Sequence, residues 1–300
     1  MFNFGISNNY NLGIISYIDK IKQNQTDFEL SFQQNSVEVN EQIENFEQGQ
    51  IGDCWLLSAL KSLSFTESGK QILDDAITEN IDGSYSVKMN GLGTKYNISQ
   101  NEVLQAKNNP KYANGDDDVV LLELAFEKAL KDVQRGKYPV PDYVSSQVYG
   151  KNDVLNGGHM QTAIYLLTGN EADVAYNSYH NDFNNDSEHL KVRILDTLYN
   201  DEITTDIENI YNKMEENPTN YAATISFKNA GYSLESLVVK DVNGEEVLLA
   251  NESHAWSIKS VQDDTITIVN PWDSNEEITV EKEEIKEHTK RISSYQIMQA

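Results

Sequence analysis

The segment QGQIGDCWLLSAL, at Gln48–Leu60, constrains the structure of this 300-residue chain more tightly than any other. From Cys54 onward its apolar residues recur at helical spacing, and Gly52-Asp53 supplies a turn and a cap in front of them. We therefore expect a buried helix that begins at Cys54, with the unpaired N–H groups of its first turn beside the thiol. Such groups lower the pKa of a thiol and favour the nucleophilic thiolate.

Helix and strand patterns are distributed unevenly along the rest of the chain. The first half is mainly helical and the second half mainly strands, which predicts an α+β fold of two lobes with a cleft between them. We place an Asn- and Gln-rich N-terminal appendage at residues 1–44, a helical lobe at 45–170 and a β-rich lobe at 171–300. The further expected helices are Gln71–Ile77, Val119–Val133, Ser187–Tyr199 and Thr204–Glu216, and the expected strands are Ser84–Met89, Lys95–Ser99, Tyr221–Phe227, His254–Val261, Thr265–Val269 and Glu277–Val280.

The charge of the chain narrows the range of its partners. Lys and Arg number 23 and Asp and Glu number 48, which gives a formal net charge of -25. A duplex-binding protein needs clustered cations, and an anionic membrane surface would repel this chain, so we expect neither nucleic acid nor membrane as a partner. We see no signal peptide or membrane span, which predicts a cytoplasmic protein or one exported without a recognisable signal.

Cys54 is the one cysteine of the sequence, so an intrachain disulfide and a multi-cysteine zinc site are excluded. A thiol nucleophile needs a base, and the chain has five histidines. Three of them, His180, His189 and His288, lie in polar or charged segments and are expected at the surface. His159 and His254 remain as candidates.

His254 opens an expected strand, and a hairpin centred on Gln262-Asp263 would pair it with Asn270. The same register pairs Trp256 with Ile268 and Ile258 with Ile266, so all six side chains would share one face. An amide oxygen beside an imidazole fixes its tautomer and leaves the other nitrogen for the thiol. The alternative is a histidine of the core, with Asn270 ending a strand before Pro271.

Three sequence blocks, taken together, resemble the calpain family of papain-like cysteine proteases. They are QGQIGDCWLLSAL at Gln48–Leu60, HAWSI at His254–Ile258 and NPW at Asn270–Trp272, and they follow one another in the family's order. Two fainter blocks are GGHMQTAIYLLTG at Gly157–Gly169 and ELAFEKAL at Glu123–Leu130. The resemblance is to a short, bacterial-type member of the family without a calcium-binding hand domain, and it implies a papain-like two-lobe core.

The resemblance also implies roles for individual residues. Cys54 would be the nucleophile, His254 the base and then the acid, and Asn270 the residue that orients the imidazole. Gln48 would donate to the oxyanion. The residues implied to bind substrate or to shield the site are Trp272 over the His–Asn hydrogen bond, Gly157 or Gly158 under an extended substrate, and Ser253, which replaces a glycine and would narrow the approach of substrate.

The implied activity is that of a cysteine endopeptidase that hydrolyses polypeptide substrates through an acyl-enzyme. Two alternatives remain: another papain-like acyl transfer, such as crosslinking or deamidation, and an inactive binding module. We expect no required cofactor and no metal ligand, with calcium kept as an alternative, because Asp182–Asp186 lacks the glycine and the glutamate of a calcium-binding hand loop. We also expect lobes that are closed without calcium, with His254 in reach of Cys54.

Overall fold

The computed structural model describes residues 37–39, 42–176, 207–227, 237–250, 254–286 and 289–297. The chain divides into two units, Met1–Glu38 and Val39–Ala300, and every element below belongs to the second. The predicted appendage at residues 1–44 therefore lies almost wholly outside the described residues. So do the predicted helix at Ser187–Tyr199, three of the five histidines and Ser253.

The first part of this unit is helical, as predicted. Its helices are α2 (Cys54–Ser64), α3 (Glu67–Ala76), α4 (Gln100–Lys107), α5 (Asp117–Gln134), α6 (Asp142–Val148) and α7 (Met160–Thr168). Side chains define several of their starts: Thr66 accepts from the N–H of Gly69, so α3 begins four residues before the predicted Gln71. Asp116 likewise accepts from two N–H groups at the start of α5.

A small antiparallel sheet accompanies these helices. It has the order β1–β2–β3, with β1 at Ile77–Glu79, β2 at Tyr85–Met89 and β3 at Thr94–Ile98. The last two strands form the predicted hairpin, which turns through the 3-10 helix Asn90–Leu92 and Gly93. Gly93 has φ +60°, a conformation that glycine adopts without strain.

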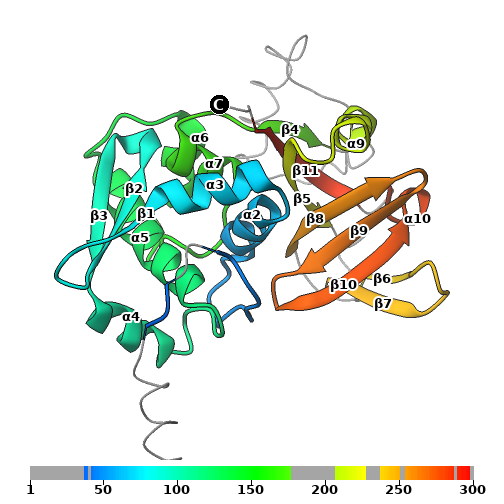
Figure 1. The fold of residues 1–300 in the computed structure, drawn as a ribbon. Coiled ribbons are helices and arrows are strands. Elements are labelled where there is room, and N and C mark those ends of the chain that lie inside the picture. The colour runs from blue at the N-terminus through cyan, green and yellow to red at the C-terminus, as the bar shows by residue number, and fades with distance from the viewer. Residues whose placement is uncertain are drawn as a thin grey trace, which may run out of the picture. The chain divides into compact units, whose positions relative to one another are not determined.

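Helix α2 is the central element, and it is apolar on nearly all sides. Its residues from Trp55 to Leu63 are all buried. The helix contacts α3, α5 and α7 as well as strands β5 (Tyr221–Phe227) and β8 (His254–Gln262) (Figure 1). A helix surrounded in this way belongs to the core of a protein, and it places Cys54 at the junction of the helices and the main sheet.

The main sheet has six strands, and all its pairings are antiparallel. Its order is β10–β9–β8–β5–β11–β4, so β8 and β5 lie in the middle. The remaining elements of this part are β4 (Asp173–Tyr176), α9 (Ile207–Glu216), β6 (Leu237–Lys240), β7 (Glu246–Ala250), β9 (Thr265–Asn270), β10 (Asp273–Glu281), α10 (Lys282–Lys286) and β11 (Thr289–Gln296), with β6 and β7 paired in a separate two-stranded sheet. The fold is thus α+β, as predicted, and it is that of a papain-like core.

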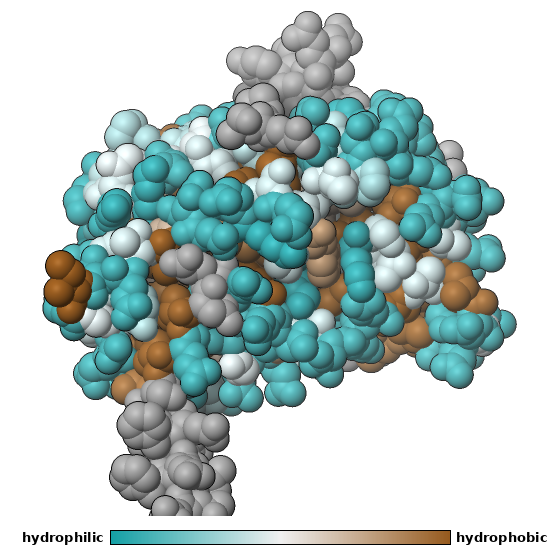
Figure 2. Space-filling model, in the orientation of Figure 1, coloured by the Kyte–Doolittle hydropathy of each residue, from teal (hydrophilic) through white to brown (hydrophobic). Residues whose placement is uncertain are grey.

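The surface in Figure 2 is mostly hydrophilic, with hydrophobic side chains in small separate patches. This distribution agrees with the large excess of acidic over basic residues. Within the described part of the chain, each helix is too short or too polar to cross a membrane.

The predicted register of the β8–β9 hairpin is wrong. The innermost pair is Gln262 with Thr265, so the turn is Asp263-Asp264, and Asp263 has φ +47°. Aspartate tolerates this left-handed conformation better than most residues. Carried along both strands without interruption, this register would place Asn270 opposite Ser257. His254 and Asn270 would then lie on opposite faces of the sheet.

A β-bulge at Lys259 restores them to one face. The register shifts between Ile258 and Ser260, and beyond that shift Ile258 pairs with Ile268. The burial of β8 shows the same change, because the buried core residues are Trp256 and Ile258 on one side of the bulge and Val261 on the other. One inserted residue therefore decides which face of the sheet His254 occupies.

We predict that deletion of Lys259 costs more than about 3 kcal/mol of the free energy of unfolding, because His254, Trp256 and Ile258 would change face relative to β9. The matched control is Lys259→Ala, which keeps the bulge and removes only the exposed ion pair with Glu277. It should cost under about 1 kcal/mol. Urea unfolding of the three proteins measures both values, and equal costs for the two variants would contradict this account of the bulge.

Candidate active site

Cys54 is the first residue of α2, and it is half-buried. Its thiol makes a hydrogen bond with the backbone of Ala255, the residue that follows His254 on β8. Ser257 fastens the same two elements further along, because its Oγ donates to the carbonyl of Ser58 at 2.9 Å. The structure therefore brings Cys54 to the strand that begins with His254.

We expected the helix start to give Cys54 a lowered pKa, and for the net pKa in this structure that expectation is wrong. Burial raises the pKa of the Cys54 thiol above its ordinary value. The backbone groups of Ala255, Trp55 and Cys54 itself oppose the rise, and the negative charge of Asp53 adds to it. Desolvation wins because the helix that positions the thiol is itself buried, so the thiol rests in its neutral form.

His254 and Asn270 are brought into direct contact. The imidazole Nε2 lies 3.0 Å from Asn270 Oδ1, and only 4% of each residue is exposed. Burial lowers the pKa of His254 to about 4, although the hydrogen bond with Asn270 acts in the opposite direction. The imidazole is therefore neutral at pH 7, and one of its nitrogens can accept a proton.

Two tryptophans enclose the imidazole. The ring of Trp272 stacks on it with centroids 4.1 Å apart and an interplanar angle of 30°. Trp256 meets it edge-on, with centroids 5.9 Å apart. Trp272 is 44% exposed, so one face of this aromatic cover contacts water.

Asn270 has two further partners, neither of which we predicted. Its Oδ1 also accepts from the backbone N–H of Trp272 at 3.1 Å, and its Nδ2 donates to Glu276 Oε2 at 2.8 Å. Glu276 lies on β10, six residues after Asn270. In the sequence it is one of several acidic residues of an expected strand region and does not stand out. Its contact depends on a second bulge, which residue types alone did not indicate.

Gln48 lies in a segment that is bonded to the main sheet. Its backbone N–H donates to the carbonyl of Pro271 at 2.9 Å, and Phe46 and Ser274 exchange two hydrogen bonds. The side chain donates through Nε2 to the carbonyl of Ile51 at 2.7 Å. Its Oε1 is buried without a hydrogen-bond partner among the described residues. Gln48 is thus held near the turn that leads into Cys54.

Gly157 and Gly158, the two glycines predicted to lie under the substrate, are packed close to the start of α2. The N–H of Gly157 donates to the carbonyl of Gly52 at 2.7 Å, and the carbonyl of Gly157 accepts from Lys151 at 2.6 Å. A Cβ on Gly158 would lie 2.6 Å from the ring of Trp55, so only glycine fits there.

A pair of buried carboxyl groups lies next to Cys54. Asp53 and Glu123 are both fully buried and lie within hydrogen-bond reach of each other. Without a proton between them, neither carboxyl oxygen of Asp53 has a hydrogen-bond partner among the described residues. Burial raises the pKa of Asp53 to about 6 and that of Glu123 well above its ordinary value. Two carboxylates in contact share one proton, and the hydrogen bond assigns it to Glu123 because it raises the pKa of Glu123 and lowers that of Asp53. The charge of the pair therefore remains at the start of α2, where the helix dipole favours it.

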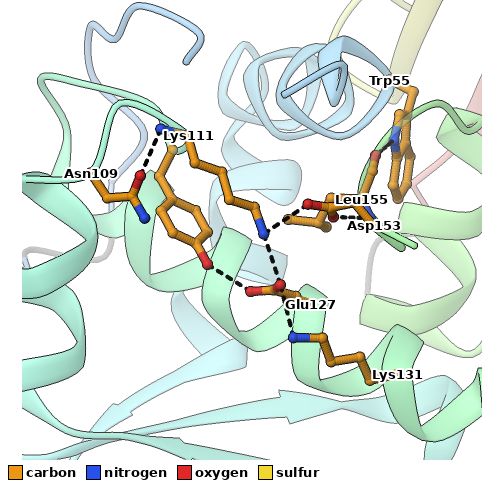
Figure 3. A network of polar contacts seen from close by, with 8 residues as sticks. Trp55, Asn109, Lys111, Glu127, Lys131, Asp153 and Leu155 are labelled. Atoms are coloured by element: carbon orange, nitrogen blue, oxygen red, sulfur yellow. Dashed lines mark hydrogen bonds and ion pairs between the residues drawn. The ribbon is translucent and has the colours of Figure 1, made fainter. Parts of the chain in front are cut away.

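Lys111 supplies the nearby positive charge, as Figure 3 shows. Its ammonium lies 2.8 Å from Glu127 and 3.0 Å from Asp153. Burial acts to lower the pKa of Lys111, but its hydrogen bonds with these two carboxylates outweigh burial and raise it. The network continues to helix α2, because Asp153 accepts from the N–H of Leu155, whose carbonyl accepts from the indole of Trp55 at 2.8 Å.

A polar pocket of about 290 Å³ opens beside this network. Cys54 and His254 are not among the residues that line it. Its lining residues are Gln50, Ile51, Asn109, Lys111, Asp153 and Asn156.

The acidic side chains near Cys54 have partners within the chain itself. In the described ranges, no three carboxylate, imidazole or thiol side chains lie close enough together to hold a metal ion. The acids nearest Cys54 share a proton, and the next ones along are paired with the ammonium of Lys111. The negative charge in this region is therefore already offset by groups of the chain itself.

A mixed α+β core in which a thiol at a helix start contacts the strand that begins with a buried, asparagine-bonded histidine is typical of papain-like cysteine proteases. The family model for calpain family cysteine proteases matches residues 26–286. No curated protein sequence matches the chain. The chain belongs to the calpain family of cysteine proteases.

We predict that Glu123→Gln flattens the pH dependence of stability above about pH 4.5, the ordinary pKa of the carboxyl group. Because the pKa of Glu123 is raised in the folded state, its proton stabilises the fold at low pH, and this contribution is lost as the pH rises above the ordinary value of 4.5. The loss amounts to about 1.4 kcal/mol per pH unit until the folded pKa is reached. A glutamine donates to Asp53 and accepts from Ala113 as protonated Glu123 does, but carries no proton to lose.

Glu127→Gln, one turn further along α5, is the matched control with the opposite sign. Burial acts to raise the pKa of Glu127, but Lys111, Tyr112 and Lys131 lower it to about 2. Its charge therefore stabilises the fold above about pH 4.5 and ceases to do so in acid. This variant should lose about 1–3 kcal/mol at pH 7. Urea unfolding at a series of pH values tests both, and parallel curves for wild type and Glu123→Gln would exclude the shared proton.

Proposed function

We propose that this member of the calpain family is an endopeptidase in which Cys54 is the nucleophile, His254 the general base and Asn270 the residue that orients the imidazole. The observation that carries the proposal is the buried hydrogen bond between His254 Nε2 and Asn270 Oδ1. The residue that follows His254 on β8, Ala255, contacts the Cys54 thiol through its backbone. Because Asn270 Oδ1 only accepts, Nε2 carries the proton. Nδ1 is then the nitrogen that receives a proton from Cys54.

The reaction begins from a neutral pair. As a peptide carbonyl approaches Cys54, the thiol proton moves to Nδ1 of His254, and the sulfur forms a bond to the carbonyl carbon. The C=O electron pair moves to the oxygen, and it returns when the C–N bond breaks and the imidazolium gives its proton to the leaving amine. Water activated by the same imidazole then hydrolyses the thioester and restores the thiol.

Helix α2 and the buried Asn270 support the charged intermediates of this cycle. The N-terminus of a helix favours a thiolate and an oxyanion, and the amide oxygen of Asn270 stabilises the imidazolium. The neutral resting pair is consistent with this scheme, because burial disfavours each charge alone while the two charges formed together attract one another. The backbone N–H of Cys54 is the first proposed donor to the oxyanion.

Gln48 is the second proposed oxyanion donor. Its amide nitrogen carries two hydrogens, and Ile51 takes one of them at 2.7 Å. The other hydrogen remains for the oxyanion, on a residue that is anchored through its backbone N–H and through this bond to Ile51. For the substrate backbone, Gly158 is a better candidate than Gly157, because both the N–H and the carbonyl of Gly157 are already bonded within the chain.

We predict that Cys54→Ala and His254→Ala each lower the rate of cleavage of an unstructured polypeptide by at least about 10³-fold, and that the double variant is scarcely slower than either. The two residues act in one proton transfer, so once either is removed, removal of the other lowers the rate little further. His159→Ala, which removes the other candidate base, is the matched histidine control and should remain active. Fragment masses and initial rates measure the effect, and additive losses would exclude the proposed relay.

We also propose that calcium is not required, because the acids beside Cys54 are occupied by a shared proton and by Lys111. Cleavage by the wild-type chain should continue at more than half its rate when a chelator replaces millimolar calcium. The thermal midpoint should differ by less than about 1 °C between the two conditions. A protein that is inactive in chelator and active in calcium would refute the proposal.

A further inference from the structure

The side-chain amide of Asn270 ends in an oxygen and a nitrogen that are similar in size but differ in hydrogen bonding. Its oxygen can only accept and its nitrogen can only donate. The oxygen edge faces two donors, His254 Nε2 at 3.0 Å and the backbone N–H of Trp272 at 3.1 Å. The nitrogen edge faces the carboxylate of Glu276 at 2.8 Å. A rotation of the amide by half a turn would oppose donor to donor and acceptor to acceptor at both edges.

This orientation decides which nitrogen of His254 carries the proton. With Oδ1 toward the imidazole, Nε2 must donate and Nδ1 is the base. With Nδ2 toward the imidazole, Nε2 would have to accept, the proton would move to Nδ1, and the nitrogen needed by Cys54 would be blocked. A residue that fixes the orientation of the Asn270 amide therefore also fixes which imidazole nitrogen of His254 can act as the base.

A bulge between β9 and β10 brings Glu276 to the amide. Asp273 pairs with Asn270, but the next pair is Glu277 with Val269, so three residues, 274–276, are inserted in β10. In an uninterrupted ladder Glu276 would lie opposite Thr267, three residues from Asn270. The insertion folds Glu276 back onto Asn270, and Ser274 of the same insertion bonds to Phe46. Bulges redirect side chains in this way beside active sites.

We propose that Glu276 is a positioning residue of the active site: its carboxylate fixes the orientation of the Asn270 amide and, through it, the tautomer of His254. The inference rests on the proposed function for its effect on turnover. Glu276 touches neither Cys54 nor the imidazole in this arrangement and acts through Asn270 alone. The carboxylate also polarises the amide, which strengthens the bond that Asn270 Oδ1 accepts from His254.

The decisive variant is Glu276→Lys, because an ammonium can only donate and would favour the rotated amide. We expect its kcat to fall at least tenfold with little change in KM. Glu276→Gln keeps an acceptor and should retain at least half of the wild-type kcat. The matched control is Glu277→Lys, which makes the same charge change on the next residue of β10, where the carboxylate pairs with the exposed Lys259. It should retain wild-type kcat.

A second measurement reads the tautomer without reference to proteolysis. Long-range ¹H–¹⁵N spectra of histidine-labelled protein at pH 7, with the His254 signal assigned by its loss in His254→Ala, should show the proton on Nε2 in wild type, Glu276→Gln and Glu277→Lys. In Glu276→Lys it should be on Nδ1. Circular dichroism and thermal unfolding of each variant establish that it is folded.

The outcomes separate the two proposals. An unchanged tautomer and unchanged kcat in folded Glu276→Lys would overturn the positioning role, and so would equal losses in Glu276→Lys and Glu277→Lys, which would indicate a general effect of charge. If the wild-type chain cleaves nothing but the tautomer changes as expected, the positioning role stands and the proposed function fails.

Discussion

A buried hydrogen bond 3.0 Å long, from His254 to Asn270, sets the strictest demand on this structure. The two side chains come from neighbouring antiparallel strands, so they can meet only on the same face of the sheet. The two-residue turn at Asp263-Asp264 alone would put them on opposite faces, and the bulge at Lys259 reverses that outcome. The bulge thus allows a two-residue turn and still places the imidazole on the face of Asn270, and it leaves one residue of β8 unpaired with β9.

The electrostatics of the site follow from how deeply its parts are buried. Burial keeps the thiol of Cys54 and the imidazole of His254 neutral, because neither charge is well solvated alone. Next to the thiol, Asp53 and Glu123 share a proton, so a strongly acidic protein keeps the negative charge beside Cys54 down to that of one carboxylate. Lys111 lies close enough to offset part of that charge.

Much of the fold could be predicted from local pattern, and the site only in part. The start of α2 at Cys54 and the strand Tyr221–Phe227 were read correctly, because periodicity and capping are properties of neighbouring residues. The hairpin register was wrong, since a bulge leaves no mark in the alternation of residue types until burial is known. The partners of Glu276 and Glu123 were not foreseen for the same reason: each depends on a segment distant in sequence or folded back by an insertion. The net pKa of Cys54 depends on the protein packed around α2, which the residue pattern of the helix itself does not reveal.

The segment that leads into the nucleophile is bonded alternately to both parts of the unit. Phe46 and Gln48 bond to Ser274 and Pro271 of the sheet side, whereas Glu47, Gln50 and Ile51 bond to Asn114, Pro110 and Lys111 of the helical side. Each such bond contributes about 0.5–1.5 kcal/mol, so parting the two sides at this end would be expensive. If Cys54 acts as proposed, a substrate would have to reach it without parting the two sides, and we expect that polypeptide to arrive already extended. Local unfolding of the substrate, more than its surface chemistry, would then determine where cleavage occurs.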